Sequence, residues 1–149
     1  MLIKVNLKIF SLIFCLIFLT GMRLPMQNIV YTVEIIDTCK KPIKGFELKY
    51  DGEQLSPASK MNLSYIGGAS YTMPMNIPNI ATVSWQEENG SKHKYDVPLR
   101  SLIKTKDIIG SKFKIIFGVC DSKLSVFFAK KTGQFEYSEK EIWSSKKKS

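Results

Sequence analysis

The stretch that decides the fold is residues 112–129, which read KFKIIFGVCDSKLSVFFA. Apolar side chains stand at every second position before and after the polar insert Asp121-Ser122-Lys123, so in an extended chain they share one face. These positions are Phe113, Ile115, Phe117 and Val119, then Leu124, Val126 and Phe128. β-Branched and aromatic residues suit a half-buried pleated surface, and the insert is short enough for a tight turn. The pattern therefore predicts a β-hairpin.

One hairpin is marginally stable in water, so this one must pack its apolar face against another sheet. Residues 29–37 are rich in Val, Ile, Tyr and Thr and predict an opening strand. Residues 46–50 alternate as a half-buried strand does, up to the Asp51-Gly52 turn. The alternation over residues 81–97, interrupted by a Glu-Glu-Asn-Gly turn, predicts a second hairpin.

The remaining segments have weaker patterns. Residues 54–62 predict a loop, and residues 65–78 predict a short strand that Pro74 confines to a sheet edge. Residues 99–109 have apolar side chains at roughly helical spacing and predict a short helix or turn between the hairpins. Residues 135–137 predict the beginning of a final strand.

Seven or eight short strands with hardly any helical period predict an all-β protein. The fold class we expect is an antiparallel β-sandwich of immunoglobulin-like size over residues 29–143. A small β-barrel gives the same pattern and remains the alternative. A chain of 149 residues is long enough for one such domain. Residues 22–28 are then a linker, and residues 144–149, Ser-Ser-Lys-Lys-Lys-Ser, are expected to be a disordered basic tail.

The front of the chain has the features of a secretory signal sequence. Lys4 and Lys8 form a positive start, and residues 9–19 are apolar apart from one serine. This run is too short to span about 30 Å of hydrocarbon comfortably. We therefore expect residues 1–21 to be a signal sequence. An uncleaved N-terminal anchor is the alternative, because no small-x-small cleavage site follows, and it would add weak membrane association.

Residues 19–22, Leu-Thr-Gly-Met, resemble the lipobox of bacterial lipoproteins, but Met22 stands where the lipidated cysteine should be. A thioether-linked lipid needs a thiol, so Met22 cannot carry one. Cys15 is preceded by Phe14 where a small residue is needed, which argues against lipidation there. The sequence predicts an exported protein in the periplasm or cell envelope of a Gram-negative bacterium.

The charge of the chain is strongly basic, with 22 basic and 13 acidic side chains and a formal charge of +9. Removal of residues 1–21 would take away Lys4 and Lys8 and leave +7. Such a surface favours acidic protein partners or anionic membrane. Nucleic acid is disfavoured, because the chain carries an export signal and no aromatic-basic stacking motif. For most of these lysines, an ordinary solvated surface is the better explanation.

After export only Cys39 and Cys120 remain, an even pair in an oxidising compartment. We predict a disulfide between them, which would join the end of the first strand to the turn of the hairpin. Two buried free thiols are the alternative, because free cysteine behaves as a small core hydrophobe.

Residue sets for catalysis or metal binding are not apparent. Serine-type hydrolysis needs a base, and the only histidine, His93, stands mid-strand between two lysines that oppose its protonation. Gly67-Gly68-Ala69-Ser70 lacks the glycine spacing of a nucleophile elbow. Two distant cysteines and one histidine do not make a metal-ligand set, and no glycine-rich phosphate cradle is present. We expect no enzymatic activity and no cofactor.

What remains is recognition of a partner at the surface. Tyr65, Tyr71, Met73 and Met75 are interspersed with Gly, Ser, Asn and Pro over residues 64–79. This mixture is found where rigid anchors and adaptable polar groups meet a partner. We predict that these four residues bind a protein. The alternative is that both tyrosines pack in the core and the glycines merely turn the chain.

Several short motifs follow one another in an order that resembles a known family. They are Lys41-Pro42-Ile43, Gly45-Phe46, Tyr50-Asp51-Gly52, Gly67-Gly68 leading to Pro74, Ala81-Thr82-Val83-Ser84-Trp85, Val97-Pro98-Leu99 and the hairpin of residues 113–128. Together they cover most of residues 40–129. They resemble small bacterial envelope lipoproteins that serve as immunity partners of type VI secretion phospholipase effectors. Met22 departs from that family's lipidated cysteine.

The resemblance implies a non-enzymatic periplasmic protein that binds an incoming lipase-type toxin and blocks its active-site entrance. A basic surface would steer such a protein toward an acidic patch of the toxin. A structural or accessory module of a bacterial envelope or secretion apparatus is the alternative function. An enzyme that uses His93 comes third.

Overall fold

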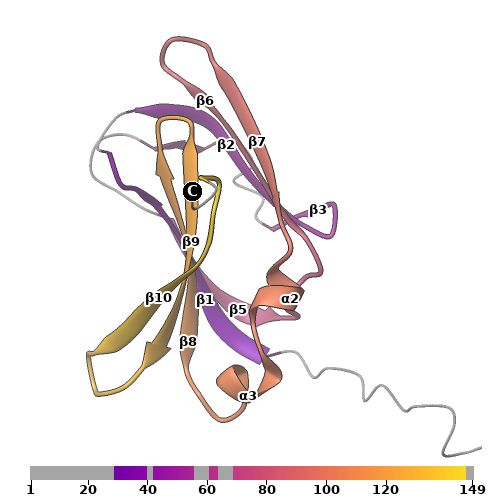
Figure 1. The fold of residues 1–149 in the computed structure, drawn as a ribbon, viewed down its shortest axis with the longest axis vertical. Coiled ribbons are helices and arrows are strands. Elements are labelled where there is room, and N and C mark those ends of the chain that lie inside the picture. The colour runs from indigo at the N-terminus through magenta and orange to yellow at the C-terminus, as the bar shows by residue number, and fades with distance from the viewer. Residues whose placement is uncertain (1–28, 40–41, 56–60, 64–68, 147–149) are drawn as a thin grey trace, which may run out of the picture.

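The computed structural model describes residues 29–39, 42–55, 61–63 and 69–146. These residues form two β-sheets that pack against each other, as Figure 1 shows. The fold is therefore a β-sandwich, as the sequence predicts. The described strands make two separate sheets, so the barrel alternative is wrong for this part of the chain. The expected signal sequence and linker, residues 1–28, lie outside the described residues.

The strands divide between the sheets as follows. Sheet A contains β1 (Ile29–Asp37), β5 (Ala69–Met75), β8 (Phe113–Cys120), β9 (Lys123–Lys131) and β10 (Tyr137–Ser144). Sheet B contains β2 (Ile43–Tyr50), β3 (Glu53–Gln54), β4 (Met61–Leu63), β6 (Ala81–Glu87) and β7 (Lys92–Val97). The strand order is β10-β9-β8-β1-β5 in sheet A and β3-β2-β6-β7 in sheet B, where β4 also pairs with β2.

Both predicted hairpins are confirmed. β8 and β9 are antiparallel and are joined by the two residues Asp121 and Ser122, so that Cys120 pairs with Lys123. Asp121 has a φ of 50°, a left-handed conformation that aspartate tolerates in tight turns. The second hairpin pairs β6 with β7, and Trp85 stands opposite His93.

The arrangement of β1 and β8 is the main departure from the antiparallel sheet that we expected. These two strands run parallel, with Val33 opposite Ile115 and Ile35 opposite Phe117. A parallel pair needs a long crossover connection, and here the crossover includes every strand of sheet B. β8 thereby becomes a central strand that is covered on both faces. Its adjacent residues Ile115 and Ile116 point to opposite faces, yet they are only 0% and 4% exposed.

The core lies between the inner faces of the two sheets and follows the alternation read from the sequence. Burial of each large apolar side chain contributes roughly 1.5–3 kcal/mol, so these faces supply most of the stabilisation. The core side chains of β1, β2, β6, β8 and β9 are Tyr31, Val33, Ile35, Ile43, Phe46, Leu48, Ala81, Val83, Trp85, Phe113, Ile115, Phe117, Val119, Leu124 and Val126.

Two backbone conformations with positive φ shape β2. Asp51 and Gly52 have φ values of 49° and 90°, which is the pattern of the two-residue hairpin turn preferred by Asp-Gly. Gly45 has a φ of 58° and lies where the pairing register of β2 shifts, between Lys44 and Glu47. A glycine in this conformation permits a β-bulge, which bends the strand.

The weakly patterned segments differ most from expectation. The two ends of the predicted loop at residues 54–62 lie in strands, because Gln54 ends β3 and Met61 begins β4, and residues 56–60 lie outside the described residues. The predicted helix or turn is two short helices, α2 (Leu99–Leu102) and α3 (Thr105–Ile108). Phe135, placed in a strand by the sequence, is 86% exposed in the turn before β10.

The C-terminal boundary also differs. β10 includes Ser144, and the backbone N–H of Ser145 donates to the carbonyl oxygen of Leu124 at 2.9 Å. The ordered domain therefore extends past the position where the sequence indicated a disordered tail. Residues 147–149 lie outside the described part of the chain.

No helix within the described residues is both long and apolar enough to cross a bilayer.

Candidate functional site

The predicted partner-binding segment is β5, one of the two edge strands of sheet A. Pro74 therefore stands on an edge, as its missing N–H requires. Tyr71 pairs with Val33, and Met75 pairs with Ile29, which places both on the inner side of the sheet. Met75 is 8% exposed and Tyr71 is partly buried against the core. For Met73 only the backbone is described, opposite Tyr31.

Tyr65 lies outside the described residues, so its predicted contact with a partner is not placed in the fold. Tyr71 and Met75 share the inward-facing register of β5. The side chains that this strand presents outward are Ser70, Thr72 and Pro74, all exposed. The hydroxyl oxygens of Thr72 and Thr32 lie 2.8 Å apart and form a hydrogen bond across the two strands.

The other side of β5 carries no strand among the described residues. Its sequence, ASYTMPM, contains no charged side chain. Charged side chains, bulges, inward-pointing charges and proline are the usual protection of sheet edges against pairing, and Pro74 gives β5 one of these features. β10, the opposite edge of sheet A, has the sequence YSEKEIWS and a register shift between Glu141 and Trp143. β5 is therefore the less protected edge and the one better suited to a partner's strand.

The predicted disulfide is confirmed: Cys39, just after β1, is bonded to Cys120 at the end of β8. Their Cα atoms are 4.9 Å apart, within the usual range for a disulfide. Thr38 supports the same junction, because its backbone N–H and its hydroxyl both donate to the carbonyl oxygen of Val119, at 2.9 and 3.0 Å. A disulfide is consistent with an oxidising compartment.

Aromatic side chains of sheet B hold the turn between β8 and β9. Trp85 donates its indole N–H to the carbonyl oxygen of Asp121 at 3.0 Å. The Tyr95 hydroxyl donates to the carbonyl oxygen of Ser122 at 2.7 Å. Tyr95 also makes an edge contact with Trp143 of β10, with ring centroids 6.0 Å apart. The two sheets are thus joined at the end of the sandwich that contains the disulfide.

His93 is engaged in a local contact at the same end. Its Nε2 lies 2.6 Å from Oε1 of Glu87, and its ring lies 5.2 Å from that of Trp85. These contacts tie β7 to β6 near their turn. These contacts give His93 a structural place in the β6–β7 hairpin.

One group of three potential metal ligands occurs within the described residues, namely Cys39, Cys120 and Asp121. Both of its sulfur atoms belong to the disulfide, so neither is available as a thiolate ligand.

The opposite end of the sandwich contains two tyrosines that the sequence did not single out: Tyr31 is buried, and Tyr50 is partly buried against the core. Burial raises the pKa of Tyr31 to about 12, while the neighbouring Tyr50 hydroxyl opposes the shift. Burial, followed by the proximity of Tyr31, raises the pKa of Tyr50 well above its usual value. The Tyr31 hydroxyl donates to the carbonyl oxygen of Asn76 at 3.3 Å, and the Tyr50 oxygen has no hydrogen bond of good geometry among the described residues. Both hydroxyls are therefore kept neutral by the core.

A cavity of about 330 Å³ lies between the α2–α3 connection and strands β9 and β10. Its apolar lining is Leu102, Ile103, Phe128 and Ile142. The register shift in β10 turns both Ile142 and Trp143 toward the core, and this brings Ile142 to the cavity. The volume is at the lower limit of small-molecule sites.

The same cavity has a basic rim made by Lys104, Lys106, Lys130 and Lys140. Asp107 is the acidic residue in the lining, which gives the lining a formal charge of +3. We call this site the lysine cavity. Sequence reasoning missed it, because its lysines come from three separate elements and no spacing rule connects them.

Comparisons of the chain with protein-family models, curated proteins and solved structures find no match in any of the three.

Proposed function

We propose that this protein is an exported, non-enzymatic binding protein that acts as an immunity protein against a phospholipase effector of type VI secretion. It works in the periplasm or envelope of a Gram-negative bacterium and occludes the active-site entrance of the toxin. The observation that carries the proposal is the outer edge of β5, which pairs with no other described strand and has no charged side chain. A strand edge of this kind recognises an extended segment through backbone hydrogen bonds.

Two further observations support an exported binding protein. The Cys39–Cys120 disulfide persists where thiols are oxidised. His93, the one histidine of the chain, is paired with Glu87 at 2.6 Å and stands where it supports the hairpin. The basic surface, with a formal charge of +9 over the whole chain, accelerates encounter with an acidic partner.

Direct binding tests the function itself. The purified protein is mixed with the phospholipase effector proposed as its partner, and both complex formation and hydrolysis of a phospholipid substrate are measured. We expect a complex and a loss of hydrolysis that titrates with the amount of protein added. An absence of both complex and inhibition would refute the immunity function.

A variant of β5 tests the site. Thr72→Arg places a charge on the exposed side of the edge strand, and such a charge disfavours strand addition. We expect at least about tenfold weaker binding, or a loss of 1.4 kcal/mol. Asn89→Arg adds the same charge at the exposed β6–β7 turn and serves as the matched control. Inhibition unchanged by Thr72→Arg would leave the immunity function standing but would exclude β5 as the site.

A further inference from the structure

We infer that the end of the molecule around the lysine cavity docks on an anionic lipid surface. This inference does not rest on the proposed function. The docking end is defined by the exposed side chains Ile109 and Phe135, together with the four lysines of the cavity, Lys104, Lys106, Lys130 and Lys140.

Two large apolar side chains at this end are exposed within the part of the chain that the structure describes. Phe135 is 86% exposed in the turn between β9 and β10, and Ile109 is 72% exposed after α3. Among the large apolar side chains of the described residues, these two are the most exposed. Apolar tips that project into solvent are suited to insertion at the boundary between lipid headgroups and acyl chains.

The two tips belong to neighbouring segments. The backbone N–H of Lys131 donates to the carbonyl oxygen of Lys112 at 2.9 Å, which joins the chain after Ile109 to the strand before Phe135. Figure 1 shows the β9–β10 turn and α3 at the same end of the sandwich, and β1 begins at that end.

The cavity lysines supply the electrostatic part of the surface. None of these four ammonium groups forms an ion pair with another described residue, whereas Lys114 on β8 is 2.7 Å from Glu34 Oε1. Each unpaired lysine near an anionic membrane adds about 1 kcal/mol, or fivefold in partitioning. The long alkyl stems can lie along the apolar lining while the ammonium groups meet the phosphates.

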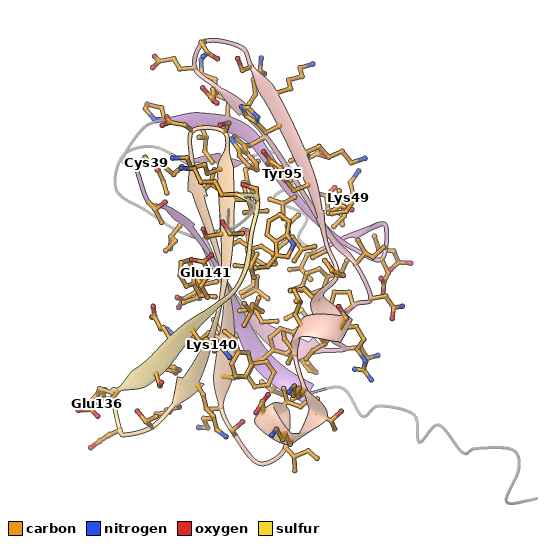
Figure 2. All side chains as sticks on the ribbon, viewed as in Figure 1. Cys39, Lys49, Tyr95, Glu136, Lys140 and Glu141 are labelled. Carbon is orange, nitrogen blue, oxygen red and sulfur yellow. A yellow bond between two sulfur atoms is a disulfide. The ribbon has the colours of Figure 1, made fainter. Side chains whose placement is uncertain are left out.

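The acidic groups at this end are Asp107, Glu136, Glu139 and Glu141. Asp107 lines the cavity, and Figure 2 shows Glu136 at the tip of the β9–β10 turn. Glu139 pairs with Ala129 and Glu141 with Phe127, so both belong to the register opposite to that of the cavity lysine Lys140. The face that carries the cavity therefore retains an excess of positive charge.

Vesicle binding by the full-length protein tests the inference. The probe is a vesicle of equal parts phosphatidylglycerol and phosphatidylcholine, compared with phosphatidylcholine alone. We expect binding that needs the anionic lipid and weakens with salt. Lys130→Glu with Lys140→Glu should reduce partitioning more than about tenfold. Lys92→Glu with Lys94→Glu makes the same charge change on β7 and should cost much less. Equal losses would overturn the inference.

Fluorescence quenching separates docking of this end from tethering by the N-terminal segment. Tryptophan is introduced by Phe135→Trp at the docking end or by Asn89→Trp at the β6–β7 turn, and the vesicles contain brominated lipid. We expect quenching of the first tryptophan and none of the second, measured against the unsubstituted protein. An N-terminal anchor alone would leave both unquenched, and that result, or equal quenching of both, would refute the inference.

Discussion

The two ends of the sandwich differ in how many of their side chains are held by contacts within the fold. At one end, which we call the disulfide end, Cys39–Cys120 and the hydrogen bonds of Trp85 and Tyr95 join the β8–β9 turn to the rest of the fold. At the other, the docking end, a cavity is surrounded by lysines that form no ion pair with another described residue, and apolar side chains are exposed. Figure 2 shows Cys39 and Tyr95 in one half of the molecule and Glu136 in the other. The first end stabilises the domain, and the second leaves surface available for binding.

Removal of the disulfide should cause the largest loss of stability. Cys39 and Cys120 are 81 residues apart in the sequence, and closure of a loop of that size restricts the unfolded chain by about 4 to 5 kcal/mol. We expect Cys39→Ser with Cys120→Ser to lower the free energy of unfolding by that order, measured by urea denaturation. The reduced wild-type protein is the control and should match the variant. A loss below about 1 kcal/mol would show that the disulfide end does not depend on its cross-link.

Alkaline pH should lower the free energy of unfolding through Tyr31 and Tyr50, which lie at the end of the sandwich opposite the disulfide. The pKa of Tyr31 rises from 10.0 to about 12 on folding, so the folded state retains the proton at pH values where the unfolded state has lost it. The stabilisation is complete below pH 10 and is lost as pH rises toward 12. The slope is about 1.4 kcal/mol per pH unit, so about 2 to 3 kcal/mol is lost in total.

Tyr31→Phe provides the control for that titration, because it keeps the ring that stacks on Phe113 with centroids 5.0 Å apart. Its free energy of unfolding should fall less steeply between pH 10 and 12 than that of the wild-type protein. Identical slopes would mean that Tyr31 titrates alike in the folded and unfolded states. Tyr50→Phe should also flatten the profile, since burial raises the pKa of Tyr50 as well.

The sequence predicted the disulfide end far better than the docking end, and the reason is physical. Alternation in β8, β9, β6 and β7 reports which side chains face the core, because a strand has a strict period of two. A pair of cysteines in an exported chain has one way to pair. The lysine cavity depends instead on where the α2–α3 connection lies against β10, and no local pattern encodes that placement.

Two other features could not be predicted from the sequence, for related reasons. The parallel pairing of β1 with β8 is a property of topology, and a strand has the same alternation whichever way its neighbour runs. Phe135 is aromatic and close to a strand, so propensity favoured strand structure there. The turn places it in solvent instead, 86% exposed.

Substitution of Trp85 should show how much the aromatic contacts at the disulfide end contribute to the free energy of unfolding. Trp85→Phe removes the N–H that donates to Asp121 at 3.0 Å and part of a side chain that is 2% exposed. We expect a loss of about 2 kcal/mol from cavity formation and an unmade hydrogen bond. Tyr95→Phe removes only a hydroxyl that bonds Ser122 and should cost about 1 kcal/mol. Equal losses for the two variants would mean that burial of Trp85 contributes little.

The smallest effect on stability should come from the lysines of the docking end. Lys130 and Lys140 are exposed, and neither forms an ion pair with another described residue. Surface substitutions of this kind change the free energy of unfolding by about 0.5 kcal/mol or less. We expect Lys130→Glu with Lys140→Glu to unfold at nearly the wild-type urea concentration while its affinity for anionic vesicles falls. A large loss of stability would instead assign these lysines to the fold, because groups that serve binding alone can be changed without cost to the folded state.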